Sequence, residues 1–188
     1  MKMPAAALNK ASYEDLYSIP ENMIGEIFDG ELFVMPRPSF RHSHAASVIS
    51  MEISAPFHIG RGGPGGWIIL YEPEICLGEN ILVPDLAGWK KERLPQPPDE
   101  NYTTIRPDWV CEILSPSTVR IDRIRKMHIY ACFEVKYSWL IDPIAKTLEI
   151  FKLESDRWVL LSAYSEHDKV RAEPFQEIEI ALQNLWWE

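Results

Sequence analysis

The clearest pattern in the chain is a short apolar run followed by an amphipathic stretch. Residues 109–114 are apolar except for Glu112, which is typical of a strand buried on both faces. Because strand residues alternate, Val110, Glu112 and Leu114 should share one face. Residues 119–133 follow with apolar positions at helical spacing and predict an amphipathic helix. The basic side chains of this helix are Arg120, Arg123, Arg125 and Lys126.

The first third of the chain predicts two helices around a hairpin. A short helix is expected at Tyr13–Ser18. The pair Asp29-Gly30 separates two strand-like runs, which predicts a hairpin with a type I′ turn. A longer helix is expected at Phe40–His58, where Pro56 should end or kink it.

The remaining predicted elements are mostly strands. Residues 67–77 and 81–89 are predicted to form the two arms of a strand pair, and the polar, proline-rich residues 90–107 to form a surface excursion. Further strands are expected at Tyr137–Ile141, Thr147–Leu153, Trp158–Ala163 and Phe175–Ile180. This order predicts a mixed α/β fold, with a curved sheet and two main helices.

Composition narrows the class of protein. A length of 188 residues with 46% hydrophobic residues suits a single domain, in which we expect residues 1–11 to be flexible. No apolar run approaches the roughly 20 residues of a membrane span, and the N-terminus has no secretory pattern. Three scattered cysteines indicate reduced thiols, and we therefore expect a cytoplasmic protein.

The net charge of −9 excludes a chain that wraps nucleic acid over its whole surface. A local positive face at residues 120–126 can still exist on an acidic body. The alternative interpretation is a solvated helix face in which Asp122 and Lys126 pair at i,i+4.

Two carboxylates stand among apolar strand residues, and each needs a partner. Glu112 is one, and Asp85, within the run Val83-Pro84-Asp85-Leu86-Ala87, is the other. A buried carboxylate requires a cation, a metal or a raised pKa. On neighbouring strands the two would suit Mg²⁺ or Mn²⁺, with a nearby lysine completing the site. Alternatively, Asp85 is a turn residue and Glu112 pairs structurally with a helix arginine.

Two histidines begin the second helix. His42 and His44 are spaced i,i+2 and so fall on different helix faces, which argues against a shared metal. His44, near the helix N-terminus, is a candidate for contact with a ligand, against the alternative of a surface or packing role.

Several motifs together resemble one known family. In chain order they are Glu26, Asp29-Gly30-Glu31-Leu32, His44, Pro84-Asp85-Leu86-Ala87, Glu112-Ile113-Leu114-Ser115-Pro116-Ser117-Thr118, Lys126, Tyr130 and Trp139-Leu140-Ile141-Asp142-Pro143. In order and spacing they resemble the Uma2 family (DUF820), of the PD-(D/E)XK restriction-endonuclease-like superfamily. Departures are modest: Glu134 stands where a glycine is common, and Tyr137-Ser138 precedes Trp139.

The resemblance implies a central mixed sheet flanked by helices and a metal-dependent phosphodiesterase site. Asp85 and Glu112 correspond to the metal-binding acids, and Glu26 to an auxiliary acid from the N-terminal region. The superfamily's usual lysine would stand at position 114, where this chain has Leu114. In this family the lysine is taken to have moved to the next helix, which here means Lys126.

The main hypothesis is therefore a Mg²⁺-dependent endonuclease that cleaves DNA with activated water. Its catalytic residues would be Asp85, Glu112, Lys126 and Glu26, and its DNA-binding residues Arg120, Arg123, Arg125 and His44. We also expect a homodimer by analogy with the superfamily, with Trp186-Trp187 available for burial against a second copy. The alternatives are a catalytically silent module that binds nucleic acid or protein, and a hydrolase of another phosphate ester. The nuclease hypothesis requires Lys126 to lie beside Asp85 and Glu112 in the fold.

Overall fold

The fold is built on a six-stranded mixed sheet with the order β11-β10-β9-β8-β6-β3. In the computed structural model, residues 10–187 are described. Of the residues 1–11 that we expected to be flexible, 1–9 lie outside the described part, whereas Ala11 donates its backbone N–H to Gly30 O. Strands β8 and β9 are parallel, and the other pairs are antiparallel. The bounds are β3 (Trp67–Tyr71), β6 (Leu86–Lys90), β8 (Trp109–Ile113), β9 (Tyr137–Asp142), β10 (Thr147–Glu154) and β11 (Arg157–Ser165).

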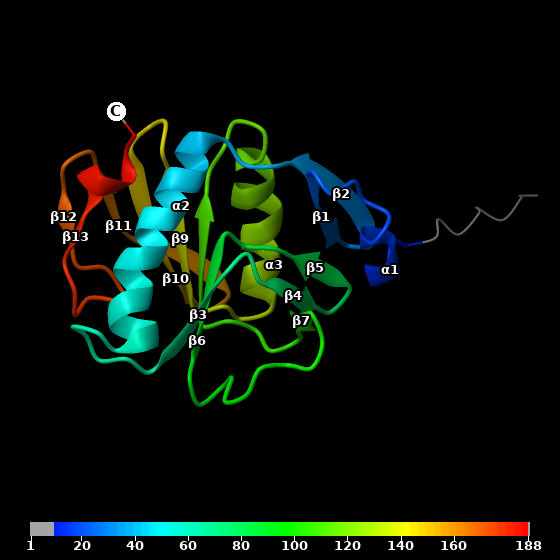
Figure 1. Cartoon of the computed structure of the whole chain (residues 1–188), viewed down its shortest axis with the longest axis horizontal. Helices are drawn as coiled ribbons and strands as arrows, with labels where there is room; N and C mark the ends of the chain where they lie inside the picture. The colour runs from blue at the N-terminus through cyan, green and yellow to red at the C-terminus, as the bar shows by residue number, and fades with distance from the viewer. Residues whose placement is uncertain (1–9, 188) are drawn as a thin grey trace, which may run out of the picture.

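Helices cover both faces of this sheet (Figure 1). Helix α2 (Phe40–Ile53) packs on one face and continues as the π-helical turn η1 (Ser54–Ile59), so Pro56 widens the helix and does not end it. The other face is covered by the π-helical turn η2 (Ile121–Lys126) and by α3 (Met127–Cys132), which link the parallel strands β8 and β9. The described helices include none long and apolar enough to cross a membrane.

A second, five-stranded sheet lies beside α3 and has the order β2-β1-β5-β4-β7 (Figure 1). The strands are β1 (Met23–Phe28), β2 (Glu31–Pro36), β4 (Glu74–Leu77), β5 (Asn80–Leu82) and β7 (Tyr102–Thr103). Asp29 and Gly30, with φ of 54° and 80°, form the turn between β1 and β2, which confirms the predicted hairpin. Helix α1 (Tyr13–Leu16) is shorter than predicted.

The predicted strand pair at residues 67–77 and 81–89 is broken in the middle. Each arm divides between the two sheets, so that β3 pairs with β6 and β4 with β5. The first break contains Glu72, whose φ is 45°, and Pro73; the second contains Pro84. Proline cannot donate to a strand ladder, and a positive φ interrupts extended backbone. Asp85 therefore lies between β5 and β6, at the junction of the sheets.

The prediction of a strand at Phe175–Ile180 is wrong. Only Ile180 of this segment is in a strand, the short β13 (Ile180–Ala181), which pairs with β12 (Lys169–Val170). Phe175 is instead fully buried, with its ring 4.9 Å from Trp109 and 5.6 Å from Trp139. This irregular segment places Phe175 inside the aromatic core. The alternation of apolar and polar residues does not by itself distinguish such a segment from a strand.

The final turn η3 (Leu182–Leu185) leads into the two terminal tryptophans. Trp186 is buried in the core of its own chain and donates its indole N–H to Glu166 O. It is therefore unavailable for the proposed burial against a second copy, and only Trp187 is exposed.

Candidate active site

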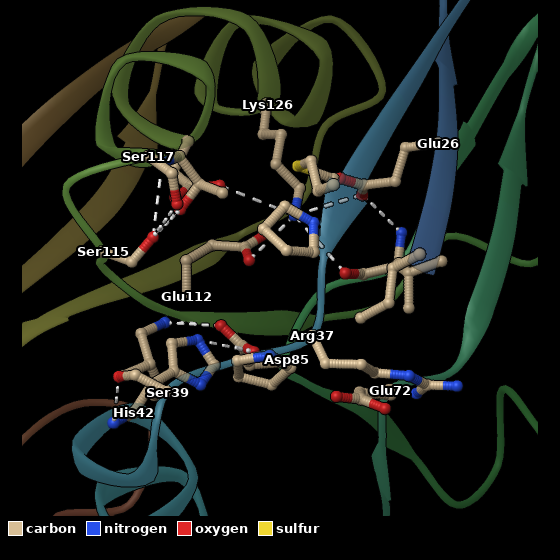
Figure 2. Close-up of a pocket in the computed structure, with 18 of the residues that line it drawn as sticks. Glu26, Arg37, Ser39, His42, Glu72, Asp85, Glu112, Ser115, Ser117 and Lys126 are labelled. Carbon is tan, nitrogen blue, oxygen red and sulfur yellow. Dashed lines mark hydrogen bonds and ion pairs between the residues drawn. The ribbon is translucent and has the colours of Figure 1, made fainter. Parts of the chain in front are cut away.

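A cavity of about 350 Å³ lies where the two sheets meet the start of α2 and of η2. Figure 2 shows side chains from both sheets and both helices pointing toward it. All three predicted catalytic acids, Glu26, Asp85 and Glu112, line it together with Lys126. The ionisable residues of the lining are Glu26, Arg37, His42, Glu72, Asp85, Glu112, Asp122 and Lys126.

Lys126 is the centre of the buried charges. Its Nζ lies 2.9 Å from Glu112 Oε2, 3.1 Å from Glu26 Oε1 and 3.7 Å from Asp122 Oδ1. The side chain is only 3% exposed. The i,i+4 pair with Asp122 exists, but it lies in the interior and not on a solvated helix face.

Glu112 has both carboxylate oxygens engaged. Lys126 Nζ approaches Oε2, and the Tyr130 hydroxyl donates to Oε1 at 2.6 Å. Leu114, at the position of the superfamily's usual lysine, is buried in an apolar cluster with Met127 and Leu140. The lysine therefore reaches Glu112 from the next helix, as the resemblance implies (Figure 2).

Burial sets the protonation of this cluster. It raises the pKa of Glu112 well above its ordinary value, because desolvation and the neighbouring acids outweigh the attraction of Lys126. Burial likewise raises the pKa of Glu26 and of Asp122. Burial alone would lower the pKa of Lys126, but the attraction of Glu112 and Glu26 raises it well above its ordinary value. The lysine therefore stays charged, while its carboxyl neighbours take up protons more readily than free acids.

Asp85 is held from two sides. Its Oδ2 accepts the backbone N–H of Ile113 at 2.6 Å, and its Oδ1 lies 3.1 Å from His42 Nε2. Burial alone would lower the pKa of His42, but the hydrogen bond to Asp85 and the negative charges of Asp85, Asp122 and Glu72 together outweigh this and raise it. The aspartate thus binds the strand next to Glu112 and places the two acids at one cavity.

The structure selects His42 and not His44 for this site. His44 Nε2 lies 3.1 Å from Asn184 O, and its ring contacts Trp187 at the C-terminus. The prediction that the two histidines occupy different helix faces is confirmed. The sequence does indicate the position of His42, because helical spacing places it on the same buried face of α2 as Ala45, Ala46 and Ile49.

The predicted DNA-binding arginines lie outside the cavity lining. Arg120 is exposed, Arg123 pairs with Glu149, and Arg125 pairs with Glu31 at 3.1 Å. The sequence interpretation missed Arg37 and Glu72, which do line the cavity. Arg37 lies in the connection between β2 and α2, and its neighbours are both prolines.

Carboxylates are the type of ligand that a hard divalent cation prefers, but too few of them are grouped here to hold such an ion by themselves. Across residues 10–187 no group of three or more histidine, cysteine, aspartate or glutamate side chains is arranged to hold a metal. Magnesium, however, is usually bound by one or two carboxylates together with water and substrate phosphate. Asp85 and Glu112 both face the cavity, and each carboxylate keeps lone pairs beyond those already used. The donor set therefore fits such an ion.

The same architecture is found in a solved protein structure. It matches the crystal structure of a "putative nuclease belonging to DUF820" from Anabaena variabilis with a TM-score of 0.73 and 22% sequence identity, over 92% of this chain and 96% of that one. The predicted mixed sheet flanked by helices is thereby confirmed.

The sequence places the chain within one family. The Uma2 family model, described as "Putative restriction endonuclease", matches residues 11–183, and the chain belongs to this family. No curated protein matches it.

Proposed function

We propose that this protein is a metal-dependent nuclease that hydrolyses DNA phosphodiester bonds with activated water. The observation that carries the proposal is the position of Lys126, whose ammonium lies 2.9 Å from Glu112 in a cavity that Asp85 also lines. Membership of the Uma2 family supports the same class of reaction.

In this proposal Asp85 and Glu112 hold Mg²⁺ or Mn²⁺. When bound, such an ion lowers the pKa of water and offsets the charge that builds on a phosphodiester. Lys126 contributes a charge that stays in place, since its acidic neighbours keep it protonated. It would stabilise the negative charge of the transition state.

The other residues act through these three. Glu26 and Asp122 hold the Lys126 ammonium, and Tyr130 fixes Oε1 of Glu112, the oxygen that does not contact Lys126. His42 fixes Asp85. These are positioning roles, because each group contacts a proposed catalytic side chain.

The charge of the cavity also favours a bound cation. Five carboxyl groups line it against three basic side chains, Arg37, His42 and Lys126. A phosphodiester would bring a further negative charge into a poorly hydrated space, where repulsion is strong. A divalent cation would remove this repulsion, and so metal dependence is part of the proposal.

The exposed arginines and the dimer stay predictions. Arg123 and Arg125 would have to exchange Glu149 and Glu31 for DNA phosphates, which surface ion pairs permit at small energetic cost. Sedimentation of the purified protein across a concentration series would show whether it is a homodimer.

The decisive experiment is a cleavage assay on supercoiled, linear and single-stranded DNA with Mg²⁺ or Mn²⁺. Asp85→Asn and Lys126→Met should each lose about a hundredfold or more of the activity, by loss of a metal ligand and of transition-state stabilisation. Asp156→Asn is the matched control, because Asp156 is exposed in a turn outside the cavity lining and has a φ of 64°, which asparagine tolerates.

Circular dichroism would verify that each variant is folded. A folded wild-type protein without cleavage, and without metal binding by calorimetry, would overturn the nuclease proposal. The silent binding module would then be the better interpretation.

A further inference from the structure

The proposed catalytic groups lie deep in the molecule. The side chains of Lys126 and Glu112 are 3% and 2% exposed, and that of Asp85 is 15% exposed. They are reached through a cavity of about 350 Å³, near the lower limit of the ~300–1,000 Å³ of ordinary small-molecule pockets. This space suits one nucleotide.

A paired DNA backbone does not match this shape. In a duplex the phosphates are fixed on a wide and stiff rod, whose major groove alone is about 12 Å across. A single strand is free to bend a phosphate and its nucleotide into a recess. The depth of Glu112 and Lys126 therefore selects for a flexible or unpaired backbone.

Part of the cavity lining is apolar, in addition to the charged residues described above. Five apolar residues from the β1–β2 hairpin, the connection to α2 and the segment before η2 line the cavity: Ile24, Met35, Pro36, Pro38 and Pro116. Such a wall offers nothing to a phosphate, but it provides contact for a base or sugar.

Two residues after Pro38 of this wall is a strongly exposed aromatic side chain. Phe40, the first residue of α2, is 88% exposed, more than any other large apolar residue of the described chain. It directly follows Ser39, which lines the cavity, and it stands between Arg37 and Arg41, both exposed. Proteins that bind single-stranded nucleic acid commonly combine basic side chains along the backbone with exposed aromatic side chains on which bases stack.

We propose that the site acts on unpaired DNA, with the segment Pro36–Arg41 as its entry platform. Phe40 stacks on a base outside the cavity, Arg37 and Arg41 contact the flanking phosphates, and the next nucleotide enters along the apolar wall. The inference rests on the proposed nuclease function and specifies its substrate class.

The test is a binding measurement that needs no turnover. A labelled twelve-nucleotide DNA strand and the same strand in a duplex are titrated with protein in Ca²⁺, and anisotropy is followed. The single strand should bind at least about tenfold more tightly. Phe40→Ala should weaken single-strand binding about tenfold, equivalent to ~1.4 kcal/mol, and Phe40→Trp should restore it.

Met51→Ala is the control, because Met51 is an exposed apolar residue of the same helix, 64% exposed, and lies outside the cavity lining. Equal binding of duplex and single strand, or equal effects of Phe40→Ala and Met51→Ala, would overturn the inference and leave the nuclease proposal standing. Phe40-dependent binding of the single strand without cleavage in Mg²⁺ or Mn²⁺ would support the platform and overturn the nuclease proposal.

Discussion

The two faces of β8 come from alternate residues of one short strand, yet their energetics are opposite. On the side of α2, Trp109, Cys111 and Ile113 join an apolar core. On the other side, Glu112 is just as deeply buried but is surrounded by ionisable groups. Burial stabilises the first face directly, whereas on the second it costs free energy that only well-placed partners offset. The first face explains the fold, and the second is where we place the chemistry.

Truncation of the apolar face should have the largest effect. Trp109→Ala removes a fully buried ring that contacts Trp139 and Phe175, and should lower the free energy of unfolding by about 3–5 kcal/mol. Urea unfolding at pH 6 and pH 8 should give the same loss, because no charge is involved. Trp109→Phe should cost less, since the Trp109 indole nitrogen has no hydrogen-bond partner among the described residues. A loss below 1 kcal/mol would contradict the division of the two faces.

Removal of the central cation should come next. Lys126→Met leaves three buried acids without their counter-ion and should cost about 3 kcal/mol at pH 8. The acids then hold protons in the folded state that they lose when unfolded, so this cost should shrink as the pH falls toward 5.

Arg123→Ala is the control, because it removes a cation of the same turn that pairs at the surface, and it should cost less than about 1 kcal/mol at either pH. Equal losses in the two variants would show that burial does not distinguish these cations.

Loss of a single hydroxyl should sharpen the comparison further. Tyr130→Phe keeps the packed ring but removes the donor to Glu112 Oε1, and should cost about 2 kcal/mol in urea unfolding. Tyr164→Phe is the matched change near the apolar face, where the hydroxyl makes no side-chain hydrogen bond in the part of the chain described, and it should be nearly neutral. Comparable losses of unfolding free energy in the two variants would mean that the hydrogen bond to Glu112 does not contribute to stability.

The smallest effect is expected at Glu173, a half-buried acid. The hydrogen bonds from Tyr137 and Lys152 lower the pKa of Glu173, so the folded protein releases this proton at lower pH than the unfolded chain. The stabilisation is complete above the unfolded pKa and is lost as the pH falls through the lower folded value. Glu173→Gln should therefore cost under about 1 kcal/mol at pH 7 and progressively less in acid, as followed by thermal unfolding. A loss that grows in acid would contradict this assignment.

Much of the backbone is predictable from local patterns. The alternation in residues 109–114 predicts both β8 and the face on which Glu112 lies, and Asp29-Gly30 predicts its turn. The pattern fails where a long-range contact decides. Phe175 belongs to a strand-like run but serves as a core plug, because four aromatic rings of other elements surround it.

The residues of the candidate site also fall into those that the sequence indicates and those that it does not. Glu112 and Asp85 stand out in the sequence because charges in apolar strands are costly and therefore need a reason. The resemblance to the Uma2 family adds Lys126 and Glu26. Arg37 and Glu72 carry no such signal, because charged residues beside prolines are common in loops.

The sequence by itself determined the β1–β2 hairpin, the strand and helix that carry Glu112 and Lys126, the alternation that buries Glu112, and the family. Only the tertiary structure decided that Lys126 meets Glu26, Glu112 and Asp122 at once, and that His42, not His44, holds Asp85. The physical reason is range: hydrophobic periodicity and turn chemistry act over a few neighbouring residues, whereas a buried charge is stabilised only by partners brought within a few ångströms from distant parts of the chain.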